Sequence, residues 1–249
     1  MAERNIHNLG RYVPTEIREE VRKRCGFGCV IFGAAWYDYE HFDPDFKDAK
    51  SHQAAGITLL CMQHNQRRAR KTLSLESVRV ANANPICLQQ GYSNETFDFG
   101  INPVEVVFAN STFIDCPSII SINGISILSI KPPKEVGQPY LVSAFFSDAD
   151  GQVTLKIVEN VFFVGSDNWD VECVGPRIIV RRSKKDISII LRSEPPSRIV
   201  VEKIDMEFEG AMIRGDEQGV QISPNSKSWT SINKGEFISC GIGIGIINR

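Results

Sequence analysis

The chain has 249 residues, of which 42% are hydrophobic and 23% are charged, a composition typical of a soluble globular protein with one large or two ordinary domains. No run approaches the roughly 20 apolar residues of a membrane-spanning helix, and the N-terminus is charged where a signal peptide has an apolar core. These features exclude wholesale disorder and predict a cytoplasmic protein with no membrane partner.

Chemically active residues and positive charge are concentrated in the first third of the chain. All four histidines and three of the seven cysteines fall within the first 64 residues. Residues 1–84 carry 13 Lys and Arg against 10 Asp and Glu (+3), whereas residues 85–249 carry 15 against 20 (−5). An odd, dispersed set of cysteines indicates thiols or metal ligands rather than a disulfide framework. We therefore expect metal chemistry and phosphate contacts in the first part.

The first predicted element is a helix between Pro14 and Gly26. Pro and Thr at its start, acidic residues in its first turn, basic residues in its last and a closing Gly all favour a helix of about ten residues. Ile17 and Val21 lie one turn apart and supply its buried stripe.

Two short strands and a second helix are predicted next. The apolar runs at residues 27–32 and 56–61 are typical of strands, and they flank a loop of residues 33–55. Residues 64–73 contain good helix formers and neither Gly nor Pro. The predicted order after the first helix is strand, loop, strand, helix.

The pattern of apolar residues changes after about residue 80. Asn82–Pro85 is predicted to be a linker between an N-terminal module (residues 1–80) and an all-β domain (residues 85–249) in which we find no convincing helical periodicity. Alternating apolar runs, separated by Asp-Gly, Pro-Pro and Gly turn signals, predict strands there. The clearest runs are residues 153–157, 178–181, 187–191 and 199–204. The fold class is therefore α+β, with either a β-sandwich or a β-solenoid in the second part.

The Gly-Ile repeat at residues 241–246 is either a core strand or an edge strand open to pairing, which leaves a homo-oligomer open. Three cysteines of the β part, Cys116, Cys173 and Cys240, have apolar or Gly-rich surroundings and are interpreted as buried thiols.

The first part contains three distinctive sequence blocks, in this order: RKRCGFGCVIFG at residues 22–33, YDYEHF at residues 37–42 and ITLLCMQHN at residues 57–65. Together they resemble a bacterial family of HNH endonucleases, over roughly residues 12–75. The resemblance implies a small ββα-metal module that binds DNA and hydrolyses its phosphodiester bonds with Mg²⁺ or another divalent metal ion.

The resemblance also implies roles for individual residues. Glu40 and Asn65 would hold the catalytic metal ion, and His41 would act as the general base that activates water. Many family members carry His at the position of Asn65, but an amide oxygen is a competent ligand for Mg²⁺. The Asn that braces the loop in the family is absent, since Gly-Ile-Thr stands at residues 56–58.

A structural zinc site is the second implication. Cys29, Cys61 and His64 match the family's zinc knuckle, but Phe32 replaces its fourth ligand. A closed zinc site almost always has four protein ligands. Three outcomes are open: Cys25 serves as the fourth ligand, a water completes a weaker site, or the module holds together by packing without zinc.

Basic residues follow the candidate metal ligand. Arg67, Arg68, Arg70 and Lys71 are predicted to form a helix face that contacts nucleic-acid phosphates, although such a face is often only solvated. The leading function is a metal-dependent DNA endonuclease with an accessory β domain for recognition, regulation or assembly. The alternative is a catalytically decayed module fused to a β domain that recognises a protein or glycan.

Overall fold

The computed structural model describes residues 4–248 and is rich in strands, with 45% strand and 16% helix. The chain divides into two compact units. The first unit comprises the residues up to Glu95 together with Val164–Cys173, and the second comprises Thr96–Phe163 with the residues from Val174 on. Within residues 4–248, no helix is both long and apolar enough to cross a membrane.

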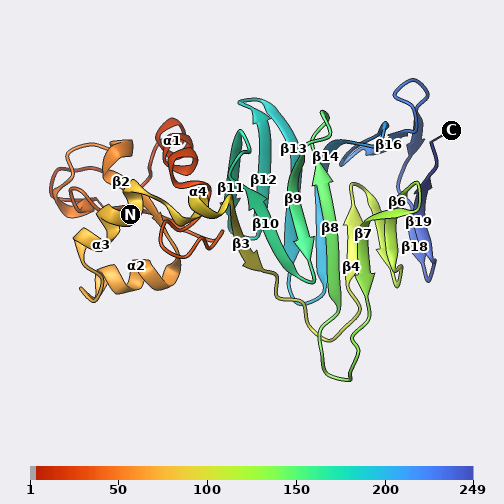
Figure 1. The fold of residues 1–249 in the computed structure, drawn as a ribbon, viewed down its shortest axis with the longest axis horizontal. Helices are drawn as coiled ribbons and strands as arrows, with labels where there is room; N and C mark the ends of the chain where they lie inside the picture. Colours follow the sequence, from red (N-terminus) through yellow and green to blue (C-terminus); the bar gives the residue numbers. More distant parts are fainter. Residues whose placement is uncertain (1–3, 249) are drawn as a thin grey trace. The chain divides into compact units, whose positions relative to one another are not determined.

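The first unit contains all the helices of the described chain and one short hairpin (Figure 1). The predicted first helix is confirmed as α1, and Gly26 ends it in the left-handed conformation with φ 68°. Val21 is buried on α1, as expected, and so is Arg22. The helical elements are α1 (Thr15–Cys25), η1 (Phe46–Asp48), η2 (Ala54–Gly56), α2 (Met62–Ala69), α3 (Leu75–Ala83) and α4 (Ile86–Gln90).

The hairpin differs from the prediction in its first strand. The expected strand at residues 27–32 is wrong, because this segment forms turns between α1 and the hairpin. The first strand is instead β1 (Asp38–His41), which pairs antiparallel with β2 (Ile57–Leu60). The second predicted strand is thus confirmed. An apolar run without alternation fits a buried turn as well as a strand, which explains the error.

Two boundaries after the hairpin also need correction. The helix predicted at residues 64–73 starts earlier and ends earlier, because α2 spans Met62–Ala69. The expected linker at residues 82–85 is the junction of two helices: α3 ends at Ala83, and α4 begins at Ile86. The expectation of no helix after residue 85 is therefore wrong for α4.

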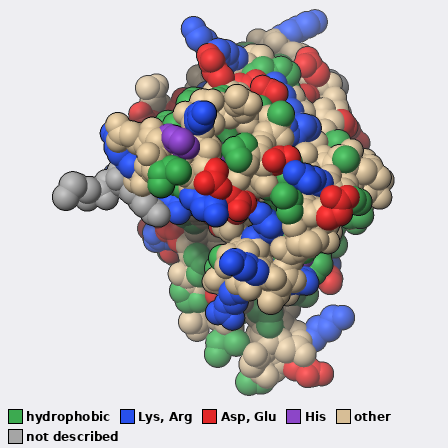
Figure 2. Space-filling model, turned by 90° about the vertical axis from the view of Figure 1, so that its left-hand side faces the viewer, with side chains coloured by type: hydrophobic (Ala, Val, Ile, Leu, Met, Phe, Trp, Pro, Cys, Tyr) green, Lys and Arg blue, Asp and Glu red, His purple; other side chains and the backbone are tan. Residues whose placement is uncertain are grey.

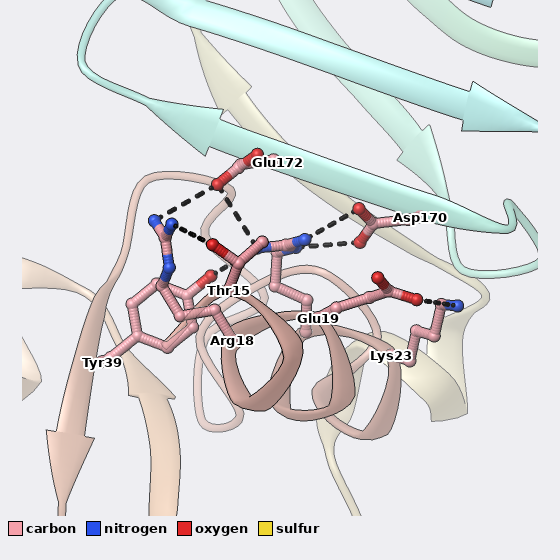
Figure 3. A network of polar contacts seen from close by, with 8 residues as sticks. Thr15, Arg18, Glu19, Lys23, Tyr39, Asp170 and Glu172 are labelled. Atoms are coloured by element: carbon pink, nitrogen blue, oxygen red, sulfur yellow. Dashed lines mark hydrogen bonds and ion pairs between the residues drawn. The ribbon is translucent and has the colours of Figure 1, made fainter. Parts of the chain in front are cut away.

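A buried ionic network holds the second segment of the first unit to α1 (Figure 3). Arg22 donates to both carboxylate oxygens of Asp170, at 2.8 and 2.7 Å, and to the Tyr39 hydroxyl at 2.9 Å. Arg22 and Asp170 are only 2% and 1% exposed. Burial works against the charge on Arg22, but the hydrogen bond that it donates to Asp170, together with the electrostatic influence of Tyr39, Asp170 and Tyr37, more than offsets burial and raises the pKa of Arg22. The network fixes β1 through Tyr39.

The strands after the hairpin form two sheets, and the strands predicted at residues 153–157, 178–181, 187–191 and 199–204 are all confirmed. In the sheets of the described chain, the orders are β19-β6-β7-β8-β9-β10-β3 and β11-β12-β13-β14-β15-β16-β17, with β4, β5 and β18 attached through β14. The strands are β3 (Tyr92–Thr96), β4 (Glu105–Phe108), β5 (Ser111–Ile114), β6 (Ser118–Ile122), β7 (Ile125–Lys131), β8 (Leu141–Ser147), β9 (Val153–Val158), β10 (Val161–Gly165), β11 (Asp170–Val174), β12 (Arg177–Ser183), β13 (Asp186–Glu194), β14 (Arg198–Phe208), β15 (Ala211–Asp216), β16 (Gly219–Ser223), β17 (Thr230–Ile232), β18 (Glu236–Ile238) and β19 (Ile242–Ile246).

Successive strands of the second unit are mostly antiparallel and joined by tight turns. Asn123 and Gly124 both have positive φ, 49° and 83°, as the turn of a two-residue hairpin requires. Alternate residues face the core, so that β8 shows a nearly regular buried and half-buried pattern. This pairing differs from the parallel stacking of β-solenoid coils. The Gly-Ile repeat forms β19, which lies at the edge of its sheet beside β6.

Candidate functional site

Strand β1 carries the predicted catalytic pair at its C-terminal end. Glu40 lies opposite Thr58, and His41 lies opposite Ile57, in the antiparallel register with β2. His41 is 7% exposed, whereas Glu40 is half-buried. Both line a pocket to which Arg68 and Lys71 also contribute. The structure thus brings two of the three predicted catalytic residues together with two of the predicted basic residues.

Charge in this pocket is nearly balanced. Burial raises the pKa of Glu40, and the positive charge of Arg68 works in the opposite direction. Arg68 is itself paired with Asp45, with an Nη2–Oδ1 distance of 2.9 Å, and Asp45 lines the same pocket. Asp45 was not predicted as a site residue.

A second histidine contacts the candidate base. The Nε2 atom of His41 lies 3.1 Å from Nδ1 of His52, which is half-buried in the loop between β1 and β2. Burial, followed by the neighbouring His52 and Arg11, lowers the pKa of His41 to about 4. His41 is therefore neutral near pH 7, the form in which an imidazole can accept a proton.

The loop that carries His52 is braced by backbone contacts and by the Asn5 side chain. The Phe42 N–H donates to the Gly56 carbonyl oxygen at 3.0 Å. A Cβ at Gly56 would lie 2.2 Å from the Asp43 carbonyl oxygen, so that only glycine fits this approach. From outside the loop, the Asn5 side chain donates to two of its carbonyl oxygens, each at 2.6 Å.

The third predicted catalytic residue, Asn65, faces β1 from α2. Its Nδ2 donates to Oδ2 of Asp38 at 3.1 Å. Asp38 and Glu40 lie two residues apart on β1, on the same face of the strand. Asn65 is not among the residues that line the pocket of Glu40 and His41. Asp38 is a further acidic residue that was not predicted.

The basic residues do not form a single helix face. Arg67 and Arg68 lie on α2, but Arg70 caps its C-terminus and Lys71 follows with φ 59°. Arg68 and Lys71 line the pocket of Glu40, whereas Arg67 lines a different pocket beside His64. Figure 2 shows Lys and Arg side chains interspersed with Asp and Glu, without one continuous basic patch on the face in view. The predicted helix face is corrected accordingly.

Cys29, Cys61 and His64 converge on one point and could hold a metal ion. Cys61 immediately precedes α2, and His64 lies in its first turn, so that both face Cys29 in the turn after α1. Nδ1 of His64 lies 3.2 Å from Sγ of Cys61 and 3.5 Å from Sγ of Cys29. In tetrahedral zinc sites, bonds of about 2.3 Å to sulfur and 2.0 Å to nitrogen hold these ligands roughly 3.5 Å apart.

Among the described residues, the cluster has no fourth protein ligand. Burial raises the pKa of Cys29, and hydrogen bonds from the backbone N–H groups of Cys61 and Phe32 work in the opposite direction. The Phe32 ring stands edge-on to the His64 imidazole, with centroids 4.2 Å apart, and Phe32 is 56% exposed. Cys25, the substitute ligand considered from the sequence, instead contacts the Thr58 hydroxyl at 3.8 Å.

Sequence reasoning missed Asp38, Asp45 and His52. Asp38 lies inside the block YDYEHF but was given no role, and Asp45 belongs to no motif, whereas the concentration of all four histidines in the first 64 residues was a signal for His52. Comparisons of the chain with protein-family models, with curated proteins and with solved structures find no match.

Proposed function

We propose that the first unit carries an HNH-type ββα-metal module that hydrolyses DNA phosphodiester bonds. The pocket at the end of β1, where Glu40 and His41 lie beside Arg68 and Lys71, is the observation that carries the proposal. The order β1, β2, α2 is the order expected of such a module. A carboxylate, a neutral imidazole and basic side chains are the groups that this hydrolysis requires.

Oxygen donors from β1 and α2 would hold the catalytic ion. Glu40, with Asp38 and Asn65 nearby, offers the hard ligands that Mg²⁺ prefers. Because Asn65 donates to Asp38 through its amide nitrogen, its side-chain oxygen is the atom that it would offer to an ion. A divalent ion bound there supplies positive charge that stabilises the negative charge developing on the phosphate.

His41 would accept the proton of the attacking water, and His52 would hold His41 in the tautomer that can do so. When His41 Nε2–H donates to His52 Nδ1, the other ring nitrogen of His41 is left as the proton acceptor. The water oxygen then bonds to phosphorus as an ester P–O bond breaks. Arg68 and Lys71 would contact the phosphate oxygens, although the pairing of Arg68 with Asp45 reduces its net attraction.

A zinc ion on Cys29, Cys61 and His64 belongs to the same proposal. The donor set and the sulfur–nitrogen distances of 3.2 and 3.5 Å fit zinc. Three protein ligands leave the fourth position to a water or another small molecule. The ion would fix the turn after α1 to the start of α2, and thereby orient Asn65.

A non-catalytic binding protein is the second candidate. Phe32 in place of a zinc ligand and the pairing of Arg68 with Asp45 are the observations that favour it. In that case the second unit would do the work by recognising a protein or glycan.

A plasmid-cleavage assay with Mg²⁺ or Mn²⁺ decides between these functions. We expect the protein to cut DNA in the presence of the metal and to lose at least about 100-fold of its rate in His41→Ala. His7→Ala is the matched control, since His7 is exposed and outside the pocket. The proposal fails if the protein does not cut, or if cutting survives in His41→Ala.

A further inference from the structure

Two cysteines of the second unit face each other, although they are 124 residues apart in the chain. The Sγ atoms of Cys116 and Cys240 lie 2.7 Å apart. Sulfur atoms of two unlinked thiols in contact lie well beyond this distance, whereas a disulfide bond measures about 2.05 Å. The two thiols are therefore within reach of one another without any movement of the strands that carry them.

The strand register places this pair independently of the sulfur positions. Before the cysteines, β18 pairs in parallel with β5 so that Ile238 lies opposite Ile114. After them, β19 pairs in parallel with β6 so that Ile242 lies opposite Ser118. Both ladders have the same offset of 124 residues, since 238 − 114 and 242 − 118 are equal. Cys240 is consequently the register partner of Cys116.

The backbone has the same conformation at the residue before each of the two cysteines. Asp115 and Ser239 have left-handed φ values of 53° and 51°. The Ser239 N–H donates to the Ile114 carbonyl oxygen at 3.0 Å, and its hydroxyl donates to the Asp115 carboxylate at 2.9 Å. The register thus continues through the bend, where the segment from β5 to β6 and the segment from β18 to β19 both pass from one sheet to the other.

We propose that Cys116 and Cys240 form a reversible disulfide that ties β18 and β19 to β5 and β6. The oxidant is a low-molecular-weight disulfide. The thiolate of Cys240, the more exposed of the pair, attacks it, and one small thiol leaves. The Cys116 thiolate then attacks the mixed disulfide at Cys240 Sγ. The second small thiol leaves, and two protein thiols have lost their protons and two electrons to the oxidant.

The bond would stabilise two strands that each have few backbone partners. β18 has three residues, and β19 lies at the edge of its sheet with β6 on one side. Short and edge strands open first in native proteins. A cross-link over a loop of this length also restricts the unfolded chain strongly.

Thiol counting and peptide mapping test the proposal on the full-length chain. Oxidised glutathione should reduce the number of titratable thiols in denaturant from seven to five, and the bridged peptides should contain Cys116 and Cys240. Cys240→Ser should keep six free thiols under the same treatment. Cys173→Ser is the matched control: it removes a buried cysteine outside the pair and should still lose two thiols on oxidation.

Stability gives a second readout that does not depend on a variant folding well. Oxidation of the wild-type chain should raise the melting temperature of the second unit by on the order of 10 °C and slow hydrogen exchange in β18 and β19. Dithiothreitol should reverse both changes. Seven free thiols after oxidation, or a bridge that maps to other cysteines, overturns the proposal.

Discussion

The two units position their side chains by different means. In the second unit, long strands such as β14, with 11 residues, fix every neighbour through backbone register. In the first unit, β1 and β2 have four residues each, and side chains set the geometry: the Arg22–Asp170 pair, the His41–His52 contact and the cysteine–histidine cluster. Single side-chain changes should therefore disrupt the first unit more than the second.

The largest effect is expected from Arg22→Met. It removes the guanidinium that pairs with the buried carboxylate of Asp170, which should lower the free energy of unfolding of the first unit by about 3–5 kcal/mol. Chemical denaturation with hydrogen exchange in α1 and β1 measures this loss. The double variant Arg22→Met/Asp170→Leu should recover a large part of it, because no buried charge remains.

A surface pair of the second unit provides the control. Arg177 donates to Glu202 with its side chain 52% exposed, so Arg177→Met should change stability by less than about 1 kcal/mol. An equal loss in Arg22→Met and Arg177→Met would contradict the contrast between the units.

Phe32→Cys should have the next largest effect, on metal affinity. A third thiolate beside Cys29, Cys61 and His64 would complete a four-ligand site, and we expect zinc to bind about 100-fold more tightly. Competition with a coloured chelator measures the affinity. Phe32→Ser removes the ring without adding a thiolate and should not tighten binding. A similar gain in both variants would show that the ring, and not the missing ligand, limits affinity.

The pH dependence of stability offers a smaller effect. The pKa of His41 is about 4 in the folded protein and 6.5 for an ordinary histidine, so the unfolded chain binds a proton between these values and the folded chain does not. Neutral His41 contributes in full to the free energy of unfolding above pH 6.5, and this contribution is lost as the pH falls to 4. In magnesium-free buffer, the free energy of unfolding of the wild type should fall by about 2 kcal/mol more than that of His41→Gln over this range. Parallel pH curves would contradict a buried neutral His41.

The contrast between the units also explains what the sequence could predict. Alternation and turn signals suffice for strands such as β9 and β13, because a strand with one buried face repeats its apolar residues at every second position. Helix α1 was predictable from its ends, with acidic residues first and Gly26 last. The segment at residues 27–32 was not, because an apolar run does not distinguish a buried turn from a strand.

The candidate site was predictable only where residues are close in sequence. Glu40 and His41 are adjacent, and Cys61 and His64 share a helix start, so their proximity follows from local structure. The buried pair of Arg22 with Asp170 joins residues 148 apart, and no local pattern predicts it. The pairing of Cys116 with Cys240 likewise depends on the register of parallel strands from distant parts of the chain.

His52→Ala gives the smallest effect and the sharpest test of how side chains set the first unit's geometry. Losing the 3.1 Å contact to His41 should lower kcat on the order of 10-fold and leave KM for DNA unchanged. The reason is that the imidazole of His41 is no longer held in a single tautomer and orientation. His52→Asn should restore most of the rate, since its side-chain oxygen can stand where Nδ1 stood and accept from His41 Nε2–H. Full activity in His52→Ala would remove His52 from the mechanism while leaving the nuclease proposal intact. A rise in KM alone would instead assign His52 to the shape of the loop, and the backbone contact of Phe42 with Gly56 would then be the feature that orients the pocket.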